Sequence, residues 1–230
     1  MRRFYVLLVF LVNLLAYAQV NDSLIKTERT VKVNDPFYRE VQFYLGITHS
    51  MYLDTPSAFK QNSISSGFQA GILRDIPINE KRNWAIATGV GFSTYNMRTN
   101  LLVLDPITMD YELNSNYTKN KQNHYFIDVP LEVRWRSSNR YSHKFWRIYT
   151  GVRYSYLLAS STKYDGYYGM IEHKNDRNLL KSQIGMYVSA GFNTWNLQVY
   201  YGFTPLYKNT VVNGAEHLKM LNIGLMFYIL

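Results

Sequence analysis

Eight segments of the chain alternate between apolar and polar residues with a period of two, which is the pattern of β-strands with two different faces. In the clearest segment, residues 124–136, every second residue from Tyr125 to Trp135 is apolar, and the positions between them include Asp128, Glu132 and Arg134. The other seven segments are residues 41–48, 64–72, 84–93, 146–158, 180–192, 195–203 and 221–229. Each has about the length that a tilted strand needs to cross a bilayer.

The connections between these segments alternate between long and short. The short ones are residues 75–81, 137–144 and 193–194, and the long ones are residues 50–62, 97–123, 160–178 and 204–216. Membrane barrels show this asymmetry, with short periplasmic turns and long outer loops. The pattern therefore predicts an all-β fold: an eight-stranded antiparallel transmembrane up-and-down β-barrel in the bacterial outer membrane.

The four tryptophans of the chain favour a membrane barrel over a soluble one. Trp84, Trp135, Trp146 and Trp195 each lie at a strand end beside a short turn, and each falls on the apolar face. An indole is best accommodated at the boundary between hydrocarbon and water. We expect these residues to form an interfacial girdle near the periplasmic surface of the membrane.

If the apolar face meets lipid, the polar face fills the lumen of the barrel. The predicted lumen contains Asp128, Glu132, Arg134 and Arg153, together with Lys181 and several glutamines. A barrel of this size has room for side chains but not for a wide channel, and buried charges must be paired. Placing Trp135 opposite Trp146 would set Asp128 opposite Arg153. We expect a locked polar plug, with a proton or ion path as the alternative.

The N-terminus has the features of an export signal. Arg2 and Arg3 precede an apolar run over residues 4–15, and Ala16-Tyr17-Ala18 supplies a signal-peptidase site. We therefore expect a signal peptide at residues 1–18, a periplasmic segment at residues 19–37 and the barrel at residues 38–230.

Composition narrows the possible chemistry. The chain has no cysteine, which excludes disulfides, thiol catalysis and thiolate metal sites. It has 21 tyrosines and a formal charge of +9, which becomes +7 without Arg2 and Arg3. For an exported protein, lipid headgroups are a more natural counter-charge than nucleic acid. We expect outer-membrane lipid as a partner, and no nucleic acid.

No motif for hydrolysis, phosphate binding or metal ligation occurs in the sequence. His49, His124 and His217 are expected near the outer rim, His173 in an outer loop and His143 at a periplasmic turn. Ser50 and Glu216 lie beside two of these histidines, so a rim triad of a lipid-modifying enzyme is an alternative. The expectation is a protein that is not an enzyme, with no catalytic residue, cofactor or metal.

Two further features concern partners. Tyr164, Tyr167 and Tyr168 lie in a predicted outer loop with two glycines, a composition found in adaptable contact surfaces. They are candidate recognition residues, although a polar loop without a partner would look the same. Residues 222–229 resemble the C-terminal signal by which outer-membrane barrels are recognised, which implies the barrel-insertion machinery as a partner.

Several stretches of the chain resemble the PorT-like outer-membrane barrels of the Bacteroidetes, especially the flavobacterial members. They are residues 67–77, 128–137, 145–151 and 224–230, and the similarity covers most of the chain after Phe37. The family is linked to type IX secretion and gliding, so the resemblance implies a porin-like barrel that serves secretion.

Two classes of function are left open by the sequence. One is a non-enzymatic structural or interaction protein of the envelope with a plugged polar lumen, such as an accessory of type IX secretion that contacts secretion or envelope proteins. The other is a narrow solute pore or a rim enzyme.

Overall fold

The structure, a computed structural model, describes residues 40–61, 63–108, 110–137, 146–209, 211 and 217–229. The expected signal peptide (residues 1–18), the whole segment before the barrel (residues 19–37) and most of the turn at residues 137–144, with His143, lie outside the described residues. Within the ranges that are described, no helix is long and apolar enough to cross a membrane.

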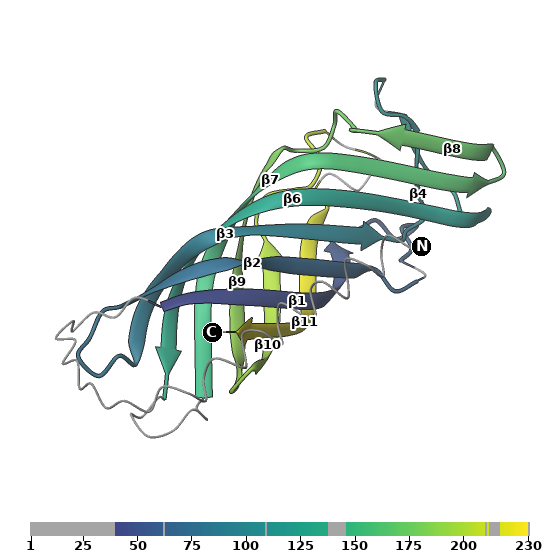
Figure 1. The fold of residues 1–230 in the computed structure, drawn as a ribbon. Coiled ribbons are helices and arrows are strands. Elements are labelled where there is room, and N and C mark those ends of the chain that lie inside the picture. The colour runs from purple at the N-terminus through teal and green to yellow at the C-terminus, as the bar shows by residue number, and fades with distance from the viewer. Residues whose placement is uncertain are drawn as a thin grey trace, which may run out of the picture. The chain divides into compact units, whose positions relative to one another are not determined.

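Eight antiparallel strands close into a ring (Figure 1). They are β1 (Glu40–Leu53), β2 (Ser66–Pro77), β3 (Trp84–Met97), β6 (Tyr117–Arg136), β7 (Trp146–Gly166), β9 (Ser182–Phe192), β10 (Trp195–Gly202) and β11 (Lys219–Ile229). Each strand pairs with the next, and β1 pairs with β11 from Phe43–Ile229 to Leu53–Lys219. Closure leaves no unpaired sheet edge in the ring, as a bilayer requires. The predicted eight-stranded up-and-down barrel is confirmed.

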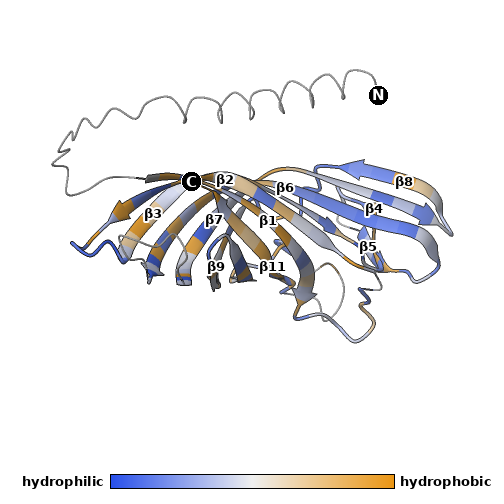
Figure 2. Cartoon of the chain, turned by 60° about the horizontal axis from the view of Figure 1, so that its bottom comes forward, coloured by the Kyte–Doolittle hydropathy of each residue, from blue (hydrophilic) through white to orange (hydrophobic). Residues whose placement is uncertain are grey.

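Three additional strands lie inside two segments that the sequence predicted as loops. They are β4 (Leu101–Asp105), β5 (Asp110–Leu113) and β8 (Gly169–Lys174). The long connections at residues 97–123 and 160–178 are present, but they are not loops throughout, because β6 and β7 are 20 and 21 residues long and stay paired with each other beyond the apolar band. Away from lipid both faces of a strand can be polar, so the alternation that marks a strand fades there. Figure 2 shows the outer part of β6 and the arrowhead end of β8 as hydrophilic.

The barrel is apolar outside and polar inside, the inverse of a soluble protein. Ile47, Val90 and Leu197 on the outward face are each more than half exposed, whereas Gln42 and Asp128 on the inward face are 2% and 0% exposed. The bilayer supplies the apolar environment of the outward side chains.

The connections at one end of the barrel fold together into an apolar cap cluster. It joins strand residues that point into the lumen, such as Tyr95 and Phe126, to residues of the long connections, such as Phe59, Leu101 and Leu206. All five are 8% exposed or less. The end that carries the long connections is therefore closed by packed side chains.

The register of β6 against β7 differs from the prediction by two residues. Trp135 lies opposite Ile148 and Asp128 opposite Ser155, not opposite Trp146 and Arg153. The backbone N–H of Ser137 donates to the carbonyl of Trp146 at 3.0 Å, so the pairing extends one residue past the end of β6. The prediction placed the two tryptophans opposite each other, but the turn that joins the strands closes around Ser137 and Trp146.

Candidate functional site

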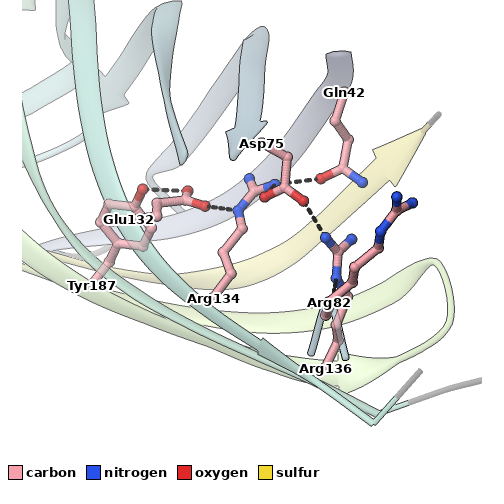
Figure 3. A network of polar contacts seen from close by, with 7 residues as sticks. All are labelled: Gln42, Asp75, Arg82, Glu132, Arg134, Arg136 and Tyr187. Atoms are coloured by element: carbon pink, nitrogen blue, oxygen red, sulfur yellow. Dashed lines mark hydrogen bonds and ion pairs between the residues drawn. The ribbon is translucent and has the colours of Figure 1, made fainter. Parts of the chain in front are cut away.

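The lumen near the short turns contains a charged network centred on Arg134 of β6 (Figure 3). Its Nε donates to Glu132 Oε2 at 2.6 Å, and its Nη1 donates to Gln42 Oε1 at 2.8 Å and to Asp75 Oδ1 at 3.3 Å. The Arg134 side chain is 1% exposed. Charge-assisted hydrogen bonds from one guanidinium thus join β1, β2 and β6 across the lumen.

Asp75 is a member of this network that the sequence analysis missed, because it was placed in a turn. It lies near the end of β2, is 1% exposed and also accepts a hydrogen bond from Arg136 Nη2. Arg136 Nε in turn donates to the carbonyl of Arg82 at 3.1 Å. The signal was present in the sequence: Asp75 lies by parity on the same inward face as Gln69.

Tyrosines complete the surroundings of the network. The Tyr187 hydroxyl donates to Glu132 Oε1. The Arg134 guanidinium carbon lies 4.6 Å from the ring centre of Tyr149 and 5.5 Å from that of Tyr228, within the range of cation–π contacts. These rings occupy volume that would otherwise admit water.

Arg153 and Asp128 form a second inward group, without the direct contact that the predicted register implied. Arg153 donates to Gln69 Oε1 at 2.5 Å and to the Tyr95 hydroxyl at 3.0 Å, and its guanidinium carbon lies 4.0 Å from the ring centre of Tyr200. Asp128 Oδ1 accepts a hydrogen bond from Ser155 at 2.5 Å. Lys181, also expected in the lumen, precedes β9 and is exposed.

Little space remains between these groups. A cavity bordered by Glu132, Arg153 and Tyr187 has a volume of about 10 Å³, which admits one water molecule at most. At Gly91, an added Cβ would lie 1.9 Å from the Tyr44 hydroxyl, and at Gly185 it would lie 2.4 Å from that of Tyr200. These glycines make room for the tyrosines, as expected for a filled lumen.

Hydrogen bonds fasten the outer connections over the apolar cap cluster. Gln122 Nε2 donates to the carbonyl of Leu101 at 3.2 Å, and the Tyr207 hydroxyl donates to Gln122 Oε1 at 3.4 Å. The Tyr111 hydroxyl lies 2.9 and 2.8 Å from the two carboxylate oxygens of Asp176. Burial raises the pKa of both Tyr111 and Asp176 above their ordinary values.

The four tryptophans lie at the strand ends next to the short turns. Trp84, Trp146 and Trp195 are each the first residue of a strand, with exposed side chains, and Trp135 lies directly opposite Trp84. Phe192 is paired with both Trp146 and Trp195. Aromatic side chains therefore line much of the circumference at this end of the barrel.

The candidate recognition tyrosines separate into two environments. Tyr167 and Tyr168 form the tip of the β7–β8 hairpin, 73% and 48% exposed, with ring centres 5.1 Å apart. Tyr164 lies within β7, is 2% exposed and donates from its hydroxyl to the carbonyl of Asn116 at 3.1 Å. The structure therefore corrects the prediction for Tyr164, because the extended strand turns this side chain inward, where it cannot contact a partner.

Glu216 lies outside the described residues, and within the ranges that are described the rim histidines do not assemble a catalytic triad. His49 is exposed on the outward face and its Nδ1 lies 2.9 Å from the carbonyl of Ser65, whereas Ser50 points inward and is 0% exposed. His124 is buried, 3.3 Å from the Tyr52 hydroxyl, and His173 contacts the carbonyl of Leu104. Across the described ranges, no three acidic or histidine side chains are grouped to hold a metal ion.

A closed ring of eight strands, apolar outside and charged inside, defines a membrane β-barrel. The family described as "Outer membrane protein beta-barrel domain" matches residues 17–208. The chain belongs to this family, and it is a protein of the bacterial outer membrane. No curated protein matches the sequence.

The solved structures to which this chain is similar include two outer-membrane proteins. The attachment invasion locus protein Ail of Yersinia pestis, solved with the heparin analogue sucrose octasulfate, is 10% identical, with 83% of this chain and 99% of that chain covered and a TM-score of 0.38. Neisserial surface protein A is 12% identical, with 84% and 98% covered and a TM-score of 0.37. Identities this low carry no information about a shared function.

Proposed function

We propose that this protein is a non-enzymatic structural and interaction component of the outer membrane, with a lumen that does not conduct. The observation that carries the proposal is that the lumen is filled by two different means. The Arg134 network occupies the part near the short turns, and the apolar cap cluster occupies the part near the long connections.

Both the Arg134 network and the apolar cap cluster would block the passage of ions through the lumen. A hydrated ion would have to displace arginine–carboxylate contacts that stabilise buried charges and then cross packed aromatic and aliphatic side chains. Opening the cap would also break the hydrogen bonds from Gln122 and Tyr207. The narrow solute pore is therefore the less favoured alternative.

The lipid-modifying rim enzyme is disfavoured by geometry. Consecutive residues of a strand point to opposite faces, so His49 and Ser50 cannot act on the same group. A nucleophile must lie within hydrogen-bond reach of its base.

Planar-bilayer recording tests the closed lumen. The purified full chain should insert without unitary currents, with heat-dependent gel migration as the control for folded barrel. Steady open-channel currents from folded protein would overturn the proposal in favour of the pore.

The interaction role is proposed to lie at the β7–β8 hairpin, where Tyr167, Tyr168 and the 89% exposed Met170 form an apolar tip. Such a tip suits contact with another envelope protein. The resemblance to PorT-like barrels favours a component of type IX secretion as that partner.

A gene replacement tests this link. Cells that carry Y167S/Y168S should export less type IX cargo than wild type, with equal amounts of folded barrel in the membrane. Normal export in both this variant and a full deletion would remove the secretion role and leave the structural one.

A further inference from the structure

The outward face of the barrel changes from apolar to basic where β6 leaves the lipid-facing band. Asn120, Gln122 and His124 point inward and are at most 4% exposed, so Lys119 and Lys121 lie on the outward face. This face continues that of the lipid-facing residues of the same strand. Figure 2 shows the colour change along β6 from the barrel to its outer end.

Strand register brings further cations next to these lysines. Lys121 lies opposite Lys163 of β7. Met97 at the end of β3 lies opposite Gln122, so the following residue, Arg98, is placed beside Lys121. We call Arg98, Lys119, Lys121 and Lys163 the basic face.

The positive charge of the basic face exceeds the negative charge of the carboxylates beside it. Lys163 pairs with Glu172 of β8 at 3.1 Å, and Asp165 lies opposite Lys119 in the register. Within the described ranges, no carboxylate lies within ion-pair distance of Arg98, Lys119 or Lys121. Three cations are therefore available to an external anion.

The height of the basic face relative to lipid follows from strand geometry. Tyr125, which stacks on Phe92 with ring centres 6.4 Å apart, marks the aromatic edge of the lipid band. Asn123 follows, in hydrogen bonds with Asn96 and Ser161. Lys121 lies four residues beyond Tyr125, about 13 Å along the strand. With a strand tilt of about 40°, this is about 10 Å along the membrane normal.

A pocket of about 510 Å³ opens at the basic face. Its walls are formed by Ser63, Arg98, Tyr117, Thr118, Lys119, Asn120, Lys121 and Asp165, so three cations face one carboxylate. Arg98 Nη1 donates to Ser63 Oγ at 3.3 Å, which orients the guanidinium. The volume lies in the range of small-molecule sites. The three cations outnumber the Asp165 carboxylate, and hydroxyls, an amide and one tyrosine ring complete a lining that suits a phosphorylated sugar.

We propose that Arg98, Lys119 and Lys121 bind the phosphorylated sugar headgroup of an outer-leaflet glycolipid. The position favours this ligand because the site lies on the lipid-facing side of the barrel wall and about 10 Å above the hydrocarbon edge. A phospholipid phosphate would lie closer to the acyl chains, whereas a sugar headgroup reaches this level. Arg and Lys provide the charge-assisted contacts that phosphate requires.

Binding of purified lipopolysaccharide to the full-length protein in neutral detergent tests the proposal. The variant K119Q/K121Q should bind about 30-fold more weakly than wild type, from a contribution of about 1 kcal/mol per cation. The matched control is R74Q/K81Q, which removes two exposed cations near the short turns at the other end. It should bind like wild type.

Three probes distinguish the source of the anion. Intact lipopolysaccharide should bind, its dephosphorylated form should bind at least tenfold more weakly, and a soluble sulfated polysaccharide should not compete. Unchanged binding by K119Q/K121Q, or an equal loss in the control, would overturn the site. Strong competition by the soluble polysaccharide would overturn the glycolipid assignment and identify a soluble polyanion instead.

Discussion

Arg134 and Glu132 lie two residues apart on the inward face of β6, and the Arg134 Nε donates a 2.6 Å hydrogen bond to Glu132 Oε2. The two side chains are 1% and 2% exposed. Their spacing is that of residues on one face of a strand, so alternation alone brings them together. Asp75, from another strand, then bonds to the same guanidinium.

Removal of Arg134 should destabilise the barrel strongly. Arg134→Met leaves Glu132 without its cation and weakens the support of Asp75, so we expect a loss of about 3–5 kcal/mol in the free energy of unfolding. Urea unfolding of the barrel in lipid, followed by tryptophan fluorescence, measures this loss. Lys81→Met, at an exposed position in the short β2–β3 turn, serves as the control and should change stability by less than about 0.5 kcal/mol. Equal stability of both variants would contradict a buried network.

The stability of the outer cap should fall as pH rises through the acidic range. Burial raises the pKa of Asp176, so the folded cap binds a proton more tightly than the unfolded segment does. Its contribution is present below the unfolded pKa of about 3.9 and is lost as pH rises through the folded pKa. Limited proteolysis of the cap at several pH values measures this. Asp176→Asn should flatten the dependence, and a profile that stays unchanged in that variant would assign it to another group.

The long connections should face the cell exterior. The chain has no cysteine, so single cysteines placed at Tyr167 and Glu80 can be labelled with an impermeant reagent on intact cells. Tyr167→Cys should be labelled, and Glu80→Cys, in the short β2–β3 turn, only after the outer membrane is permeabilised. The reverse pattern would mean an inverted barrel.

The tryptophan side chains should lie at the membrane surface. Trp84, Trp146 and Trp195 are 44%, 60% and 62% exposed on the outward face at one end of the barrel. Their indole rings are best satisfied between hydrocarbon and headgroups. Quenchers attached near the headgroup should therefore reduce their fluorescence more than quenchers deep in the acyl chains. A stronger effect of the deep quenchers would show that the girdle lies within the hydrocarbon.

The sequence alone determined the strands of the barrel and their two faces. A bilayer favours apolar side chains on the outward face of a spanning strand, so the alternation from Tyr125 to Trp135 is a local signal that needs no knowledge of other strands. For the same reason the inward positions of Asp128, Glu132, Arg134 and Arg153 could be assigned by parity. The alternation of long and short connections can also be read directly from the sequence.

The tertiary structure decided which of these inward residues meet. Pairing of Arg134 with Asp75 and of Arg153 with Gln69 depends on the register between strands, and the observed register of β6 against β7 differs by two residues from the one that the sequence predicted. The apolar cap cluster depends on ring closure, which brings together segments that are distant in the chain. Outside the lipid band a strand needs no apolar outward face, so its sequence does not have to alternate. The extension of β6 and β7, the inward side chain of Tyr164 and the basic face could therefore be seen only in the structure.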